Sequence, residues 1–219
     1  GLTYGNLGTG GHAKVPWEQL YLDHEIFGTF WPGFGTHTVE HRAIDPAGNI
    51  GLPGMFKATV LPGKSPEPTN IVTGQHKGKL IVEKGVTLID GATINGDVVV
   101  KPGASLVVSD GSNIKGDLQA DRAAVIHLFG ATVDGKATIS GTNDDVIIAG
   151  SKFKRTLTVT GNRCQVVKFL SGKLHQYGVA LVGNVIAGDL TCLDNNPGVT
   201  DFGAPNSVNG AKKGQATGL

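Results

Sequence analysis

The chain has 219 residues, with 19 basic and 18 acidic side chains and a formal net charge of +1 at pH 7. Nucleic acid is therefore not expected among its partners, because phosphate binding needs clustered Lys and Arg. Glycine is abundant at 34 residues and charged residues make up only 17%, which favours tight turns between short strands and predicts an all-β protein. No apolar run approaches the roughly 18 residues of a membrane-spanning helix, so no transmembrane segment is expected.

The first 63 residues lack any repeat and contain most of the aromatic side chains. Their densest aromatic stretch is FGTFWPGFG at 27–35, with two further aromatic residues nearby, and the candidate binding residues in this group are Trp17, Tyr21, Phe30, Trp31 and Phe34. Such a group can form the core of a small sandwich, a contact surface for another chain or domain, or a platform for sugar rings. We expect the core role and keep binding of a partner or a glycan as the alternatives.

Four of the seven histidines lie in the first 41 residues. His37 and His41 are four residues apart, so on one strand they share a face at a separation of about 13 Å. That distance is too long for the two to bind one metal ion, and a site would need His24 or His12 as well. No H-E-x-x-H pair is present. We therefore expect ordinary histidines and no cofactor, with a metal site at His24, His37 and His41 as the alternative.

The phrase GTHTVEHRAIDPAGNIGLPGMFKATVLPG spans residues 35–63. It resembles the final two strands of the immunoglobulin-like modules of secreted bacterial proteins, so two consecutive strands are expected here, and the matching residues are Thr36, Val39, Arg42, Ala43, Asp45, Ala47, Gly48 and Asn49. His41 stands where those modules usually have a Tyr. The resemblance implies a partial immunoglobulin-like β-sandwich over residues 1–63. A complete sandwich needs about 100 residues and seven strands, so either this module is abbreviated or another chain completes it.

Residues 64–71 are predicted to form a linker, because the segment LPGKSPEPTN at 61–70 contains three prolines. Prolines suit a semi-rigid connection and do not suit a central strand.

The given sequence begins with Gly1, Leu2 and Thr3, without a Met or a signal peptide. We therefore expect a processed product or the tail of a longer precursor.

From residue 72 onward one phrase recurs about every 20 residues, as in ATINGDVVV at 92–100 and SNIKGDLQA at 112–120. Residues two before, two after and four after a central glycine are apolar, which is the two-residue period of a strand. His76 is the polar exception. The central slots hold Gly78, Gly96, Gly116, Gly135, Arg155, Gly188 and Gly210.

This spacing predicts a parallel β-helix over residues 72–219, a solenoid with coils of about 20 residues stacked about 4.8 Å apart. The 33 residues between Arg155 and Gly188 predict an irregular coil or an insertion there. A further strand is expected to close each coil, at 105–108, 125–128, 146–149, 166–170, 179–182 and 199–202.

Three apolar residues of these closing strands, Val107, Ile147 and Phe169, have His127 between them in the repeat. They form either an exposed outward stripe that marks a docking face or, after a one-residue shift, part of the interior. We expect inward packing.

Two carboxylates, Asp97 and Asp117, follow central glycines in neighbouring coils, at about the separation of a nucleophile and acid pair in glycoside hydrolysis. No aromatic residues or long loops flank them, so we expect solvated charges and keep a catalytic pair as the alternative. Elsewhere, Asp144 and Asp145 are predicted to form a turn, with calcium binding as the alternative.

The chain has two cysteines, Cys164 and Cys192. Their number allows one disulfide or two free thiols, and the sequence leaves both states open. The C-x-x-C spacing of a redox or zinc site is absent.

An immunoglobulin-like end, a Pro-rich linker and a glycine-punctuated β-helix together resemble the C-terminal regions of large secreted actinobacterial enzymes over residues 35–219. The resemblance implies a secreted, non-catalytic accessory region or processed subunit that docks on another polypeptide, or on the rest of its precursor, and provides a rigid surface-binding arm. The alternatives are a carbohydrate-active β-helix enzyme (a polysaccharide lyase or glycoside hydrolase) and a carbohydrate-binding module with a polysaccharide ligand. The β-helix alone is also similar to bactofilin-type solenoids, which carry no immunoglobulin-like neighbour.

Overall fold

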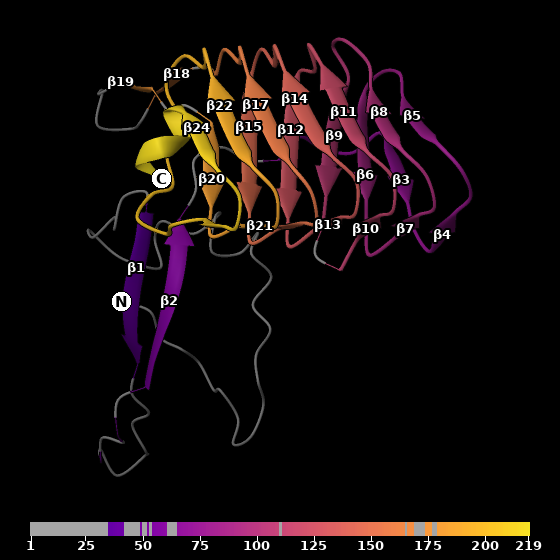
Figure 1. The fold of residues 1–219 in the computed structure, drawn as a ribbon. Helices are drawn as coiled ribbons and strands as arrows, with labels where there is room; N and C mark the ends of the chain where they lie inside the picture. The colour runs from indigo at the N-terminus through magenta and orange to yellow at the C-terminus, as the bar shows by residue number, and fades with distance from the viewer. Residues whose placement is uncertain are drawn as a thin grey trace.

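The structure is a computed structural model that describes residues 35–41, 49, 52, 54–60, 65–109, 111–164, 166–168, 174–176 and 179–219. Within these residues the regular elements are short β-strands, with η1 (Gln215–Gly218) as the single helical turn. The predicted all-β class is therefore confirmed for the described part of the chain. Figure 1 shows the strands stacked in the successive coils of a solenoid.

Three parallel sheets form the walls of the solenoid, and each complete coil contributes one strand to each wall. Sheet I contains β4 (Gln75–His76), β7 (Thr93–Ile94), β10 (Asn113–Ile114), β13 (Thr132–Val133), β16 (Lys152–Phe153), β21 (Val185–Ile186) and β23 (Ser207–Val208). Sheet II contains β5 (Leu80–Val82), β8 (Val98–Val100), β11 (Leu118–Asp121), β14 (Ala137–Ser140), β17 (Leu157–Thr160), β22 (Leu190–Leu193) and β24 (Lys212–Gly214). Sheet III contains β3 (Asn70–Val72), β6 (Val86–Ile89), β9 (Ser105–Val108), β12 (Val125–Phe129), β15 (Asp145–Ala149) and β20 (Ala180–Val182).

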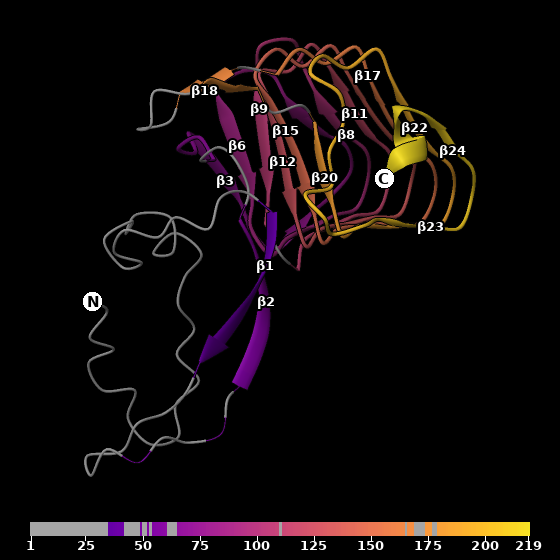
Figure 2. The ribbon, with the colours of Figure 1, turned by 90° about the vertical axis from the view of Figure 1, so that its left-hand side faces the viewer.

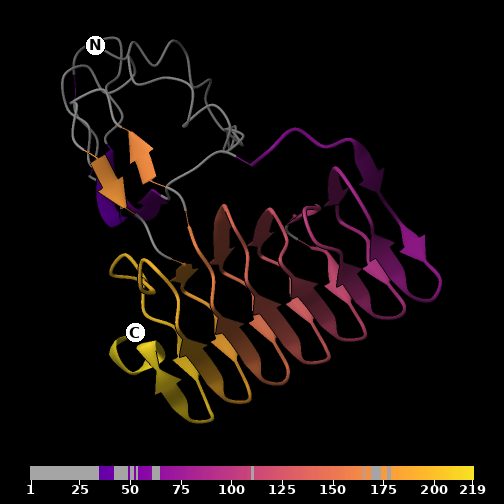
Figure 3. The ribbon, with the colours of Figure 1, turned by 90° about the horizontal axis from the view of Figure 1, so that it is seen from above.

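Equivalent residues of successive coils lie beside one another, as the repeat predicts. Leu118, for example, pairs with Val98 of the coil before and with Ala137 of the coil after. Because like residues are aligned, the inward side chains form continuous columns, and the slots predicted to be apolar are buried from Leu80 to Cys192. The parallel β-helix is thus confirmed, and Figure 3 shows its coils in succession from above.

The corner between sheets I and II explains the central glycines. A Cβ atom on Gly116 would lie 2.3 Å from Asp97 Oδ1 and 2.6 Å from the carbonyl carbon of Gly96. Glycine is needed because adjacent corners lie in direct contact, and the N–H of Gly116 donates to the Gly96 carbonyl at 3.1 Å. Among the described residues, Arg155 makes no such bond to the glycine of the coil before it. Backbone contacts as close as those of Gly116 occur at Gly96, Gly135, Gly188 and Gly210.

The other two corners hold buried side-chain amides in the C-terminal half of the solenoid. Between sheets III and I, Asn184 Oδ1 accepts the N–H of Ser151 at 2.9 Å. The amide nitrogen of Asn184 donates to the carbonyl of Ile148 and to Asn206 Oδ1, both at 2.8 Å. Buried backbone groups need partners where the chain turns, and an amide supplies both a donor and an acceptor. Between sheets II and III the corresponding run is Asn162, Asn195 and Gln215.

The long gap after Arg155 contains an inserted hairpin. In it β18 (Val166–Lys168) pairs antiparallel with β19 (Leu174–Gln176). The prediction that residues 166–170 close a coil was therefore wrong, because β20 takes the place beside β15 in sheet III. Residues 199–202 likewise contribute only one isolated bridge, between Ala180 and Thr200, and no strand.

Before the solenoid, β1 (Gly35–His41) and β2 (Gly54–Val60) form an antiparallel pair in which Gly35 lies opposite Val60. Two consecutive strands were predicted here from the immunoglobulin-like phrase. The sandwich itself stays a prediction, because residues 1–34 lie outside the described part of the chain. The first strand of the solenoid, β3, begins at Asn70, within the segment predicted to be the linker.

Both ends of the solenoid replace the apolar column with polar groups. At the N-terminal end the half-buried His76 occupies an inward slot, and its Nε2 lies 3.4 Å from the Lys79 carbonyl oxygen. At the C-terminal end Lys212 follows Leu190 in its column, and its ammonium donates to the carbonyl of Leu219. Polar terminal coils are what a solenoid needs at ends that meet water. Figure 2 looks onto the C-terminal end.

Candidate functional site

The aspartates that follow the central glycines, at the corner between sheets I and II, take part in the contact between successive coils. Asp97 Oδ1 accepts the backbone N–H of Asp117 at 2.9 Å, and Asp117 Oδ1 accepts the N–H of Lys136 at 2.8 Å. Asp189 Oδ1 accepts the N–H of Ala211 in the same way. One oxygen of each carboxylate is therefore bound to the backbone of the next coil. These bonds favour a structural role for Asp97 and Asp117 over a catalytic pair.

Several other predicted site residues fall outside the residues that the structure describes. His37 and His41 lie on β1, opposite Ala58 and Gly54. Within the described ranges no group of three or more His, Cys, Asp or Glu side chains is placed to hold a metal ion. No helix there has the length and apolar character needed to cross a membrane. The residues outside these ranges are His24 and the aromatic group Trp17, Tyr21, Phe30, Trp31 and Phe34.

Asp144 lies in the turn before β15, as predicted, whereas Asp145 is the first residue of that strand and pairs with Val125. Burial raises the pKa of Asp145 to about 6, and the nearby Asp144 charge acts in the same direction. The pKa of Asp144 is also raised by burial.

The question left open for the cysteines is settled: Cys164 and Cys192 are buried free thiols. Burial raises their pKa values to about 11 and about 12, which makes both thiols poor nucleophiles.

The outer face of sheet III is apolar, and its part over β9, β12, β15 and β20 is covered. Val107, His127 and Ile147 pair in adjacent strands and form one column, which Ala180 continues. Their chain neighbours belong to the central core, so by alternation these side chains point out of the solenoid. Even so, His127 is 1% exposed and Ile147 is 3% exposed. For Val107 and Ile147 the prediction of inward packing was wrong: the column faces outward, and other parts of the chain bury it. Phe169, the third residue of that prediction, lies outside the described residues.

The residues next to this column extend the apolar surface. Ile147 and Ala180 pack with Val182 in a cluster separate from the central core. Phe129, Ala149, Phe202 and Ala204 contact the same cluster. Sheet III therefore carries apolar side chains on both faces, which is typical of a sheet covered on both sides.

His127 marks a contact between this face and the segment before the solenoid. Its Nδ1 lies 2.9 Å from Ser65 Oγ, and its ring meets the Phe129 ring edge-on at a centroid distance of 5.7 Å. Its Nε2 is buried and has no hydrogen-bond partner among the described residues. Burial lowers the pKa of His127 to about 4, so the ring is neutral at pH 7.

Residues 65–69 cross the outer side of sheet III. Their first residue, Ser65, contacts β12, while Thr69 is bonded to β6: its Oγ1 donates to the Val86 carbonyl and accepts the Val86 N–H at 3.0 Å. In sheet III, β12 and β6 are separated by β9. The segment preceding β3 therefore runs from the outer side of β12 to the edge of β6, where Thr69 continues the β3 ladder.

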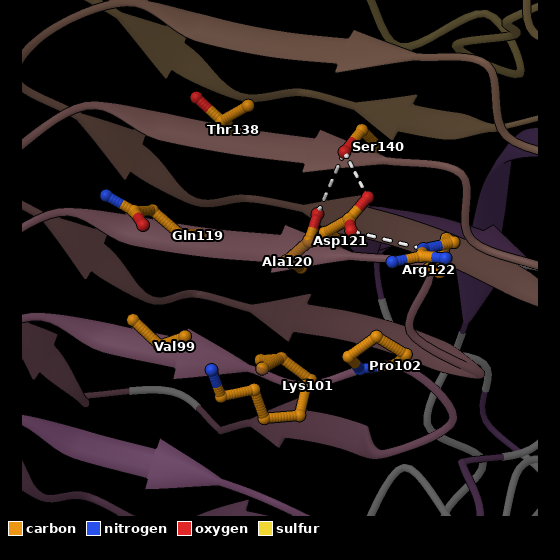
Figure 4. Close-up of a pocket in the computed structure, with 10 residues that line it drawn as sticks. Val99, Lys101, Pro102, Gln119, Ala120, Asp121, Arg122, Thr138 and Ser140 are labelled. Atoms are coloured by element: carbon orange, nitrogen blue, oxygen red, sulfur yellow. Dashed lines mark hydrogen bonds and ion pairs between the residues drawn. The ribbon is translucent and has the colours of Figure 1, made fainter.

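The outer face of sheet II, by contrast, is open and polar. One outward column contains Val99, Gln119, Thr138, Thr158 and Thr191, all exposed or half-buried. Next to it, a shallow depression of about 460 Å³ spans β8, β11 and β14. Figure 4 shows Val99, Gln119 and Thr138 in one row along the depression and Arg122 at its turn. Its polar lining residues are Lys101, Gln119, Asp121, Arg122, Thr138 and Ser140.

The charged groups of the depression lie where β8 and β11 end: Asp121 is the last residue of β11, and Lys101 and Arg122 directly follow β8 and β11. Arg122 Nε donates to Asp121 Oδ2 at 3.2 Å, and Ser140 Oγ donates to Asp121 Oδ1 at 3.3 Å. Arg122 has a φ of 51°, in the left-handed region. Its stem lies beside Gly141, where a Cβ atom would be 3.1 Å from Arg122 Cγ. The turn therefore holds the guanidinium group at the rim of the depression.

Comparisons of the chain with protein-family models, with curated proteins and with solved structures gave no match. Its function is therefore argued from its own residues.

Sequence reasoning named three residues of the covered face, Val107, His127 and Ile147, and none of the cations in the depression. His127 was visible as a polar residue within an apolar column. Lys101 and Arg122 carried no such signal, because both lie in turns outside the repeated phrase.

Proposed function

We propose that this chain is a non-catalytic accessory region of a secreted bacterial protein, in which the solenoid is a rigid support for its neighbours. The observation that carries the proposal is the covered outer face of sheet III. A solenoid wall that serves only as a spacer has no need of apolar side chains on its outer side, since water covers that side. Here Val107, His127 and Ile147 form a buried outward column, and Ser65 contacts it.

In this proposal the covered face anchors the part of the chain that precedes the solenoid. Residues 65–69 hold the entry to the first coil against β12 and β6. Burial of one Val or Ile side chain contributes about 1.5–3 kcal/mol, so the apolar column is sufficient to hold a docked segment in one orientation. The β-helix then acts as a stiff arm whose second broad face, sheet II, stays free for a surface or a ligand.

The backbone bonds of Asp97 and Asp117 support a non-catalytic role. They leave the described part of the chain without a pair of free carboxylates on adjacent coils at this corner. The immunoglobulin-like resemblance of residues 35–63 is consistent with a docked module and enters the proposal as that resemblance only.

The test compares matched Asp substitutions on the two outer faces. Ile147→Asp places a charge in the covered column, and Thr158→Asp places it at an outward slot of the open sheet. Amide hydrogen exchange is measured for residues 65–69, where Ser65, Glu67 and Thr69 carry the exchangeable N–H groups because Pro66 and Pro68 have none, and for the strands of sheets I and II. We expect Ile147→Asp to raise exchange in residues 65–69 while sheets I and II keep their protection, and Thr158→Asp to change neither.

A milder variant guards against loss of folding. Ser65→Ala removes the hydroxyl that contacts His127 and leaves the solenoid sequence unchanged. It should raise exchange in residues 65–69 to a smaller extent than Ile147→Asp. Unchanged protection of residues 65–69 in both variants would show that the face does not anchor this segment, and the proposal would be withdrawn.

A further inference from the structure

The open face of sheet II carries hydrogen-bonding groups without partners, and this feature goes beyond the proposed support role. Within the described residues, the ammonium of Lys101, the amide of Gln119 and the hydroxyl of Thr138 make no hydrogen bond or ion pair. All three line the same depression. In Figure 4 the Lys101 side chain runs along the sheet toward the Val99 and Gln119 row.

Arg122 adds a second cation at the turn. Its Nε atom donates to Asp121 Oδ2, which leaves the two terminal nitrogens free to donate. A guanidinium held in this way is suited to a carboxylate, because its fork of N–H groups matches two carboxylate oxygens. The depression therefore contains two cationic groups and one carboxylate, and that carboxylate is already shared by Arg122 and Ser140.

We propose that this depression binds an anionic polysaccharide, with sugar carboxylates at Lys101 and Arg122 and sugar hydroxyls at Gln119 and Thr138. The excess of unpaired donors complements a carboxylate-bearing ligand. The two uncharged groups, an amide and a hydroxyl, fit hydroxyl groups, which both donate and accept.

The shape of the face favours a chain ligand over a small molecule. The depression is shallow, and small-molecule sites are concave and mostly apolar. Beyond Thr138 the outward column continues with Thr158 and Thr191, at the inter-strand spacing of about 4.8 Å. A polymer that lies along the solenoid axis therefore meets a threonine hydroxyl in each of three successive coils, at Thr138, Thr158 and Thr191.

Nucleic acid fits this face less well. Specific and non-specific binding of DNA both depend on neutralising many phosphates, typically about 6–10. The depression offers only Lys101 and Arg122 as cations. A uronic acid polymer needs fewer cationic side chains for binding, and its hydroxyl groups can also bond the uncharged Gln119 and Thr138.

The experiment measures binding of polygalacturonate to the full chain by isothermal titration calorimetry. The variants are Lys101→Gln, Arg122→Gln and, as a matched control, Lys152→Gln, which removes one exposed charge from sheet I. We expect Lys101→Gln and Arg122→Gln each to weaken binding about tenfold, since each removes hydrogen bonds to a charged group. The control should leave the affinity unchanged.

Two further ligands distinguish binding of an anionic polysaccharide from binding of any glycan and from binding of any polyanion. A neutral glucan of similar length should bind at least about tenfold more weakly than polygalacturonate, and duplex DNA should not compete with polygalacturonate at about 200 mM salt. Absence of polygalacturonate binding, or an equal loss in Lys152→Gln, would overturn the proposal. Equal affinity for the neutral glucan, or competition by DNA, would overturn the assignment to an anionic polysaccharide. Hydrogen exchange of residues 65–69 is independent of these results, so the support role is tested separately.

Discussion

The corner glycines offer a direct test of how the coils are held together. Replacing Gly116 with Ala adds a single Cβ atom, which would lie 2.3 Å from Asp97 Oδ1 and 2.6 Å from both the Asp97 nitrogen and the Gly96 carbonyl carbon. Two of these three atoms belong to the backbone of the preceding coil, so a change of side-chain rotamer cannot relieve the contact. The substitution must separate the two coils at this corner.

The cost follows from what that separation breaks. The Gly116 N–H bond to the Gly96 carbonyl at 3.1 Å and the Asp117 N–H bond to Asp97 Oδ1 at 2.9 Å both cross the corner. Each is worth about 1 kcal/mol, and forcing an extra carbon into a packed site costs about 1–3 kcal/mol. We therefore expect the free energy of unfolding to fall by about 4 kcal/mol.

Gly103 provides the control, because it separates conformational strain from crowding. It has a φ of +78°, and a Cβ atom there would meet nothing within 4 Å. Gly103→Ala should therefore cost only the left-handed backbone penalty of about 1–2 kcal/mol. Urea unfolding followed by circular dichroism measures both variants against the unchanged chain. If Gly116→Ala were no more destabilising than Gly103→Ala, contact between corners would not set the spacing of the coils.

Three further predictions concern buried polar groups. Asn184→Leu should lower the free energy of unfolding by at least about 3 kcal/mol, because it leaves buried backbone groups without partners; urea unfolding measures it. His127 has a pKa lowered to about 4 by burial, so between pH 6.5 and about 4 the unfolded chain binds a proton that the folded chain does not. Stability should therefore fall by roughly 3 kcal/mol as the pH drops through this window, and His127→Leu should remove that dependence in pH-dependent urea titrations. Asp145, with a pKa raised to about 6, has the opposite effect: its protonation in the folded chain increases the free energy of unfolding as the pH falls. The contribution of His127 is therefore obtained from the difference between the pH profiles of the unchanged chain and His127→Leu. Cys164 and Cys192, whose pKa values are raised by burial, should resist alkylation at pH 8 in the folded chain and react once it is unfolded in urea, as mass spectrometry can follow.

Each of these three predictions has a result that contradicts it. A loss in Asn184→Leu no larger than that of the exposed Asn209→Leu would show that the corner amides are not needed. An unchanged pH profile in His127→Leu would place the acid sensitivity elsewhere in the chain. Rapid alkylation of either cysteine in the folded chain would show that its thiol is accessible or its pKa is not raised.

The solenoid was predictable because its signal is local and repeated. The alternation of apolar residues around Gly96, Gly116 and Gly135 identifies strands, and a constant interval of about 20 residues requires that the strands stack. The insertion after Arg155 was visible as a change in that interval. Its hairpin was assigned wrongly, because residues 166–170 have the composition of a closing strand and composition does not say which of two strands takes a place in a sheet.

The outer faces were harder to interpret for the same reason. The alternation around His127 and Ile147 fits either face of sheet III, inward or outward. That the outward side is covered follows only from the tertiary contact between Ser65 and His127 of β12. Lys101 and Arg122 lie 21 residues apart in turns of no regular pattern. Their approach to one depression depends on the register of β8 against β11.

The amino-acid sequence alone determined that residues 72–219 form a stack of parallel coils, since period, apolar alternation and glycine position are properties of neighbouring residues. It also determined that the central slot of the repeat requires glycine, but not that the reason is close backbone contact between successive coils. Tertiary structure decided which wall is covered, which wall is open, and that the carboxylates of Asp97 and Asp117 bind backbone N–H groups of the next coil. The physical reason is that these contacts join residues of different coils, or of the solenoid and the segment before it, and a local pattern carries no information about which distant group lies beside it.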